Sequence, residues 1–229
     1  MTQEKDSTAC AIRLRQIKDT LKSGVQLVAV SKFHPANLIQ EAYDEGQRIF
    51  GESRVQELQF KHEALPDDIQ WHFIGHLQVN KVKYIAPYIS LIHAVDSYRL
   101  LAEINKQAAK NNRIISCLIE LHIAQEESKY GFTIDECTNL LENSEWRSLK
   151  NIQIAGLMCM ASNTDDTQQI QKEFHTALEY FNEVKTRYFS SDSNFCLRSW
   201  GMSHDYAIAM KEGATLVRIG TAIFGEREY

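Results

Sequence analysis

Short apolar runs alternate with amphipathic stretches along the chain, and this alternation restricts the fold more than any other feature. The runs predicted as strands are 26–30, 48–51, 70–75, 91–96, 114–123, 152–160, 196–201 and 215–220. The stretches predicted as helices are 9–21, 35–43, 55–64, 80–85, 98–110, 134–142, 167–188 and 205–211. Strands that alternate with helices are typical of a parallel α/β sheet.

Eight strand–helix units predict a single (β/α)8 TIM barrel over residues 1–229, preceded by an extra N-terminal helix. A doubly wound open sheet is the alternative. That fold binds dinucleotides with a glycine-rich loop after its first strand, whereas here the first strand is followed by Ser31 and Lys32. The barrel is therefore the favoured architecture.

Composition and charge exclude several classes of protein. The chain has 25 Lys and Arg against 30 Asp and Glu, and a net charge of -5 is unfavourable for binding nucleic acid. No apolar run approaches the roughly 18 residues of a membrane span, and the polar start does not resemble a signal peptide. Five widely spaced cysteines without a C-x-x-C pair predict neither a disulfide framework nor a zinc site. We therefore expect a cytoplasmic protein.

Lys32 is the sharpest candidate for chemistry. Side chains alternate along a strand, so Val28, Val30 and Lys32 share one face, and Lys32 would point into the mouth of the barrel. Desolvation lowers the pKa of a lysine from about 10.4, and a neutral amine can attack a carbonyl to form a Schiff base. The alternative is a strand-end lysine that reaches solvent.

Arg218 shares a face of the last strand with Leu216 and Gly220. Barrel strands are covered on both sides, so an arginine at this position needs a specific partner. That partner is either a ligand in the mouth of the barrel or a neighbouring carboxylate in a buried ion pair.

Two loops near the C-terminal ends of the last strands predict a phosphate site. Ser203 precedes a helix, where it serves either as an N-cap or as part of an anion site built from backbone N–H groups. Gly220 and Thr221 follow the last strand and would complete the cradle. Barrel enzymes often bind phosphate at these two loops.

Other polar and sulfur-bearing positions are interpreted as structural. His72 and His76 stand four apart on a strand and do not face one metal, so hydrogen-bonded structural roles are expected. The run 158–160 is expected in the core, and the charged residues Glu126, Glu127 and Lys129 in a solvated loop.

With these residues in hand, the chain resembles the YggS/PROSC family of pyridoxal phosphate homeostasis proteins. The resemblance covers nearly the whole chain, and its motifs occur in order: Ala29-Val30-Ser31-Lys32, Phe50-Gly51-Glu52 with Val55-Gln56-Glu57, Trp71-His72-Phe73-Ile74-Gly75-His76-Leu77-Gln78 with Asn80-Lys81, Gly156-Leu157-Met158, Gly201-Met202-Ser203 with Asp205, and Val217-Arg218-Ile219-Gly220-Thr221 with Ile223-Phe224-Gly225.

The resemblance implies a barrel related to the N-terminal domain of alanine racemase, with pyridoxal 5'-phosphate held by Lys32 as an internal aldimine. It implies that Arg218 faces the pyridine nitrogen, and that Ser203 holds the phosphate together with the backbone N–H groups of Met202, Gly220 and Thr221. A further contact is expected from Ser53, which stands where the family has asparagine. At the next position, Arg54 replaces an aromatic residue.

The same resemblance points to cofactor storage, buffering or delivery rather than to catalysis. A permanently cationic arginine leaves the pyridine nitrogen unprotonated and weakens the ring as an electron sink. Racemisation also needs a second acid/base, which in alanine racemase is a tyrosine from another domain across a dimer. This chain ends directly after the barrel, so we assign no catalytic residue and expect a monomer.

Two other functions stay open. One is a small enzyme that uses pyridoxal phosphate on amino acids, such as a weak racemase. The other is a phosphosugar barrel enzyme in which Lys32 acts as in an aldolase. For the favoured function, transient partners would be apoenzymes that receive the cofactor.

Overall fold

The computed structural model describes residues 8–125 and 130–226, and these form a closed parallel barrel. The strands run in sequence order: β1 Gln26–Val30, β2 Ile49–Glu52, β3 Gln70–Phe73, β4 Leu91–Val95, β5 Ile115–Leu121, β6 Ile152–Cys159, β7 Leu197–Ser199 and β8 Leu216–Ile219. β1 pairs with β8, with Val28 opposite Arg218, and this pairing closes the sheet. The predicted barrel is confirmed and the open doubly wound sheet is wrong.

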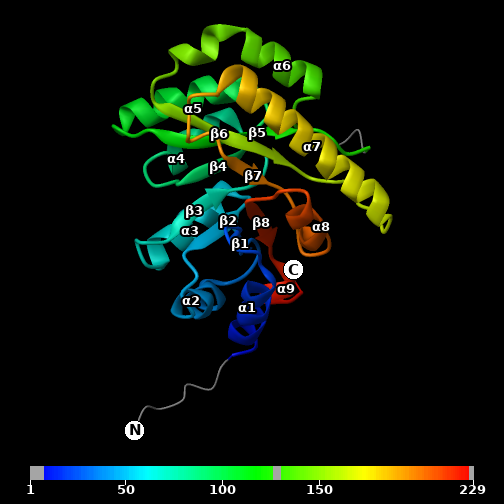
Figure 1. Ribbon diagram of the computed structural model, residues 1–229. Coiled ribbons are helices and arrows are strands. Elements are labelled where there is room, and N and C mark those ends of the chain that lie inside the picture. Colours follow the sequence, from blue (N-terminus) through cyan, green and yellow to red (C-terminus); the bar gives the residue numbers. More distant parts are fainter. Residues whose placement is uncertain (1–7, 126–129, 227–229) are drawn as a thin grey trace.

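Helices surround the barrel in the arrangement that the alternation predicts (Figure 1). The α-helices are α1 Ala9–Thr20, α2 Ala36–Asp44, α3 Val55–Ala64, α4 Val82–Ile85, α5 Tyr98–Lys110, α6 Ile134–Glu142, α7 Thr167–Tyr188, α8 Tyr206–Lys211 and α9 Thr221–Phe224. Two 3-10 helices are η1 Val79–Lys81 and η2 Ser144–Ser148. The extra N-terminal helix is α1, which lies beside α9 (Figure 1), and Arg13 Nε donates to the Ile223 carbonyl at 2.7 Å.

Local sequence explains where several helices begin. Ser97 caps α5 through a bond from the Leu100 N–H, and Asp166 caps α7. Thr133 and Glu136 form a capping box at the start of α6, in which each side chain accepts from the other's backbone N–H. These side chains satisfy N–H groups that a helix leaves open in its first turn.

The structure differs from the predicted elements mainly at their ends. β5 is shorter than the predicted 114–123, and β7 has three residues where six are predicted. The helix α9 is not predicted at all. Its four residues are too few to show a helical period in the sequence.

The alternation of side chains along the strands produces two apolar layers. Outward-facing residues such as Leu27, Phe50 and Trp71 pack in the larger core cluster beneath the surrounding helices. A smaller cluster contains Val28, Leu91, Ala94, Leu118, Ala155, Met158 and Leu216. Because Val28 lies opposite Arg218 and shares its face of β1 with Val30, this cluster fills the barrel beneath its mouth.

Within the described ranges, no helix combines the length and the apolar composition that a membrane crossing needs.

Candidate functional site

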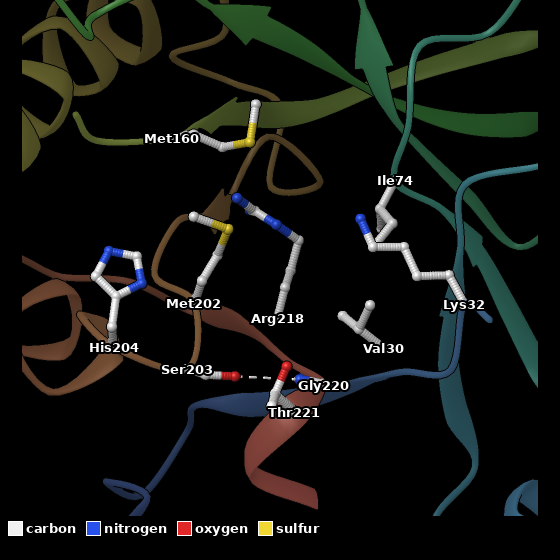
Figure 2. A pocket seen from close by; sticks show the side chains of 10 residues that line it. All are labelled: Val30, Lys32, Ile74, Met160, Met202, Ser203, His204, Arg218, Gly220 and Thr221. Carbon is white, nitrogen blue, oxygen red and sulfur yellow. Dashed lines mark hydrogen bonds between the residues drawn. The ribbon is translucent and has the colours of Figure 1, made fainter. Parts of the chain in front are cut away.

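A cavity of about 240 Å³ opens at the C-terminal ends of the barrel strands (Figure 2). It brings together six of the seven residues predicted to bind the cofactor. The residues that line it are Val30, Lys32, Ile74, Met160, Met202, Ser203, His204, Arg218, Gly220 and Thr221. Most of them come from the two ends of the chain, because closure of the barrel places the end of β1 beside the end of β8, while Ile74 and Met160 follow β3 and β6.

Lys32 enters this cavity from the end of β1. Val28 is fully buried in the barrel, Val30 lines the cavity, and Lys32 continues the same alternation two residues later. Figure 2 shows its side chain extended into the cavity, with the amine on the side of Ile74. The prediction that Lys32 points into the barrel mouth is therefore confirmed by the structure.

The loop that carries Lys32 is held by a buried ion network. Lys61 Nζ donates to the Ser31 carbonyl at 2.8 Å and contacts Glu52 Oε1 at 2.7 Å and Glu57 Oε1 at 2.6 Å. The same Glu57 oxygen accepts the Phe33 N–H at 2.6 Å. These bonds hold the backbone on both sides of Lys32, at residues 31 and 33.

The network also gives Lys61 different surroundings from Lys32. The Lys61 ammonium is buried and directs its three N–H donors to three protein oxygens. Phe33 has a φ of 68°, in a region that bulky residues rarely occupy. The Glu57 bond holds the backbone at this turn, and Lys32, rather than Lys61, lines the cavity.

Arg218 is buried and fixed by three hydrogen bonds. Its Nη1 donates to the Ser199 carbonyl and to Ser199 Oγ, both at 2.6 Å, and its Nη2 donates to the Cys159 carbonyl at 2.9 Å. Burial lowers the pKa of Arg218, but a guanidinium stays cationic in proteins. Of its five N–H groups, two have no acceptor among the described residues, and Arg218 lines the cavity.

A polar layer crosses the barrel beneath the cavity. His93 Nδ1 lies 2.9 Å from Ser199 Oγ, and His93 Nε2 lies 3.0 Å from His72 Nδ1. Burial lowers the pKa of His72 to about 3, and burial, His72 and Arg218 lower the pKa of His93. Both imidazoles are therefore neutral. The hydrogen-bonded role predicted for His72 is confirmed.

The two loops predicted to hold phosphate meet at the lower edge of the cavity in Figure 2. The Gly220 N–H points at Ser203 Oγ over 3.4 Å, a long contact, and Thr221 opens α9. In the part of the chain that the structure describes, the backbone N–H groups of Ser203 and Thr221 have no protein acceptor. Open N–H groups at a loop and a helix start attract an anion.

At Met202 the structure differs from the predicted cradle. The Met202 N–H donates to Asp205 Oδ1, an acceptor within the same turn, and is therefore already engaged. Gly201 makes this turn possible: its φ is 94°, and a Cβ there would lie 2.6 Å from the Ala209 Cβ. Met202 reaches the cavity through its side chain, which Figure 2 shows beside Arg218.

Ser53 lies outside this cavity. It lines a separate one of about 220 Å³ at the ends of β2 and β3, together with Arg54, His76 and Lys81. A Cβ at Gly75 would lie 2.7 Å from the Ser53 Cβ, so the two backbones are in close contact. His76 Nδ1 bonds to Asp96 Oδ2 at 2.8 Å, which is a hydrogen-bonded role as predicted.

Three cavity residues do not follow from the sequence analysis: Ile74, Met160 and His204. Ile74 follows β3 and Met160 follows β6, so the strand-end rule that identifies Lys32 also applies to them. Met160 is predicted in the core, whereas Met158 and Cys159 are indeed buried there. His204 directly follows Ser203 in the phosphate-loop segment. The charged positions 126, 127 and 129 lie outside the described residues.

The chain matches a family model described as "Alanine racemase, N-terminal domain" over residues 6–228. The Pyridoxal phosphate homeostasis protein of Aquifex aeolicus (strain VF5) is 42% identical over 206 residues, which cover 89% of this chain and 88% of that protein. The chain belongs to the pyridoxal phosphate homeostasis protein family. The corresponding protein of Haemophilus influenzae is 35% identical and covers 100% of this chain and 94% of its own length.

Comparison with solved structures supports this family assignment. PipY of Synechococcus elongatus PCC7942 without PLP superposes with a TM-score of 0.88 at 35% identity, covering 94% of this chain and 100% of PipY. PipY with PLP bound gives a TM-score of 0.83 at 34% identity, with the same coverage. Alanine racemase of Bartonella henselae, at 18% identity and a TM-score of 0.73, shares the fold and covers 96% of this chain and 59% of the racemase.

Proposed function

We propose that this protein binds pyridoxal 5'-phosphate through a Schiff base on Lys32 and serves cofactor homeostasis by storing, buffering or delivering it. The observation that carries the proposal is the cavity, where one lysine amine, one buried arginine and two loops with open N–H groups converge. Relatives named for pyridoxal phosphate homeostasis, and the PipY structure with PLP bound, support the choice of cofactor.

The cavity offers a different contact to each end of the cofactor. Ser203 Oγ and the N–H groups of Ser203, Gly220 and Thr221 suit the dianionic phosphate. The two remaining N–H groups of Arg218 suit the ring nitrogen, which they approach only as donors. The Lys32 amine condenses with the aldehyde carbon and releases one water, so that attachment is covalent and reversible.

The arginine favours retention over catalysis. Bound pyridoxal phosphate supplies an electron sink, which is stronger when its ring nitrogen is protonated. Arg218 stays cationic and offers that nitrogen a hydrogen-bond donor but no transferable proton. The protein therefore holds its cofactor in a poorly activated form, in keeping with storage and transfer to apoenzymes. We propose that it does so as a monomer.

Chemical trapping tests the attachment site. The purified protein is incubated with pyridoxal phosphate, reduced with borohydride and digested, and the labelled peptide is identified by mass spectrometry. We expect the pyridoxyl group on Lys32, and none on Lys61, whose ammonium is saturated. A label on another lysine, or the absence of any label, would refute the proposed site.

A weak racemase or related enzyme is the second candidate, and His204 is the observation that favours it. His204 lines the cavity, with 44% of its side chain exposed, and its Nε2 lies 3.3 Å from Asp205 Oδ2. A histidine so placed can exchange protons with a bound amino acid. Single-enantiomer amino acids in deuterated water separate the candidates, because sustained exchange of the α-hydrogen at an enzyme-like rate, lost in His204→Ala, would overturn the storage function.

A further inference from the structure

The polar layer beneath the cavity contains groups that the proposed function does not use. Ser199, His93 and His72 are buried, and none of them lines the cavity. Together with Arg218 they form a continuous line of hydrogen bonds from β8 through β7 and β4 to β3. Buried polar groups are costly unless every member finds a partner, so the direction of each bond in this line has physical consequences.

The direction of the first bond is fixed by chemistry. A guanidinium has five donors and no acceptor, so Arg218 Nη1 must donate to Ser199 Oγ, over 2.6 Å. Among the described residues, the Ser199 hydroxyl contacts two groups, Arg218 Nη1 and His93 Nδ1. The arginine accepts nothing. The Ser199 proton therefore points to His93 Nδ1, which lies 2.9 Å away.

The remaining bonds follow from the first. A neutral imidazole that accepts at Nδ1 carries its proton on Nε2, so His93 Nε2 donates to His72 Nδ1 across 3.0 Å. His72 in turn carries its proton on Nε2, the ring nitrogen outside the line. All the bonds therefore run one way, from Arg218 toward His72, and each histidine has a single compatible tautomer.

We infer that Ser199, His93 and His72 are positioning residues, which fix the plane of the Arg218 guanidinium and thereby the donors that it presents to the ring nitrogen of the cofactor. Both Nη1 donors are engaged by Ser199, and the Cys159 carbonyl holds Nη2, so the guanidinium cannot turn without breaking the line. His93 also offers no proton to the cavity, because both of its ring nitrogens are engaged within the line.

This inference rests on the proposed function, because that function identifies the ring that Arg218 contacts. The direction of the hydrogen bonds from Arg218 to His72 does not depend on which ligand binds. Nitrogen NMR of the cofactor-free protein, labelled with ¹⁵N-histidine, distinguishes protonated from unprotonated ring nitrogens. Signals are assigned with the variants His72→Gln and His93→Gln. We expect His93 and His72 both to carry their protons on Nε2. A proton on Nδ1 of His93 in the wild-type protein would overturn the inference, whether or not pyridoxal phosphate is the ligand.

A second readout connects the line to the cavity. Pyridoxine 5'-phosphate has no aldehyde and binds without a Schiff base, so its affinity reports on ring and phosphate contacts alone. We expect Ser199→Ala to weaken its binding about tenfold, the scale of a hydrogen bond that involves a charged group, and Ser199→Cys to give an intermediate loss. Binding of inorganic phosphate should be unchanged, because the cradle lies at the other end of the cavity.

Controls separate positioning from general damage. Ser191→Ala, at an exposed position between α7 and β7, should change neither affinity. Ser203→Ala should weaken both ligands, because Ser203 belongs to the cradle. If Ser199→Ala weakens the binding of inorganic phosphate as much as that of pyridoxine 5'-phosphate, or leaves both affinities unchanged, the positioning role is refuted. If no variant and no ligand shows binding, the proposed function fails while the NMR result still decides the direction of the line.

Discussion

Lys32 and Lys61 belong to one region of the structure, yet their surroundings give them different roles. Lys61 is buried and directs its donors to Ser31, Glu52 and Glu57, so its charge is compensated and its amine is engaged. Lys32 lines the cavity. A reactive amine needs access to its aldehyde as well as a favourable environment, and among these two residues Lys32 meets that condition.

Replacement of Lys32 tests how much covalent and non-covalent contacts each contribute to binding of the cofactor. We expect Lys32→Ala to abolish the Schiff-base absorption while some pyridoxal phosphate remains bound through its phosphate, because Ser203, Gly220 and Thr221 are untouched. Absorption spectra and equilibrium dialysis measure the two quantities on the same sample. An unchanged spectrum in the variant would place the attachment on another lysine.

Replacement of Ser203 tests the phosphate end. Ser203→Ala removes one hydroxyl from the cradle, and we expect retention of the cofactor to weaken by about 1 kcal/mol, or by more if the lost bond is to charged phosphate. The dissociation constant for pyridoxal phosphate is the measurement, with exposed Ser148→Ala as the matched control. Equal affinities in Ser203→Ala and wild type would exclude this hydroxyl from the site.

At the scale of elements, α3 holds the loop between β1 and α2 through two side chains. Glu57 and Lys61 both come from α3, one turn apart, and reach residues 31 and 33 on either side of Lys32. The helix thus transmits its position to the loop through two side chains. At the opposite wall, Gly201 lets the chain turn tightly against α8 before Ser203.

Loss of Lys61 should therefore damage both stability and the loop. Lys61→Met leaves the buried carboxylate of Glu52 and the partly buried carboxylate of Glu57 without their shared cation, and removing one partner of a buried ion pair costs about 3–5 kcal/mol. Urea denaturation measures this loss, with Lys83→Met on the exposed face of α4 as the control. A variant as stable as the control would show that the network contributes little.

At the scale of the whole molecule, burial in the barrel shifts the pKa values of Glu120, His72 and His93 toward their neutral forms. Glu120 is 3% exposed, and its Oε2 has no hydrogen-bond partner within the described structure. Burial raises its pKa to about 7, the charge of Asp96 adds to this, and Arg218 opposes it. The pKa values of His72 and His93 are shifted in the opposite direction, downward, because burial disfavours the charged forms of these histidines.

The raised pKa of Glu120 predicts a contribution to folding stability that decreases as pH rises, and the substitution Glu120→Gln isolates this contribution. Between about pH 4.5 and 7 the unfolded chain loses the Glu120 proton while the folded barrel keeps it, so this group's stabilising contribution falls as pH rises. Wild type should therefore lose stability relative to Glu120→Gln by up to about 1.4 kcal/mol per pH unit across this window. Both proteins contain the same histidines, so their contribution cancels in the difference.

Urea denaturation of the two cofactor-free proteins from pH 4 to 8 measures this difference. It should be flat below pH 4.5, where Glu120 is protonated in both states, and flat again above pH 7, where it is ionised in both. A difference that grows in favour of wild type with rising pH would contradict the shift.

Strand alternation made the barrel and the placement of Lys32 predictable, because a period of two assigns each residue to a face without knowledge of distant contacts. Other features depend on which residues meet across the fold. The partners of Arg218 are a serine on β7 and a carbonyl at the end of β6, rather than a ligand alone or a carboxylate. No local pattern in the sequence indicates such a set.

The same limit explains Ser53 and Met202. Ser53 follows β2 as predicted, but the close contact of its backbone with Gly75 places it in the neighbouring cavity. The Met202 amide lies at the predicted loop, but Asp205, three residues on, captures it within the turn. In both cases the residue is in the expected segment, and a contact that sequence spacing does not determine decides what it can bind.

The pairing of β1 with β8 has a consequence for the newly made chain. Val28 and Arg218 are opposite each other in the closed sheet, although the ribosome joins them nearly the whole length of the polypeptide apart. A growing chain that still lacks its last strand presents the Lys32 amine without the Arg218 guanidinium or the loop that follows β8. If the cofactor binds as proposed, its capture therefore begins only after synthesis of the final strand.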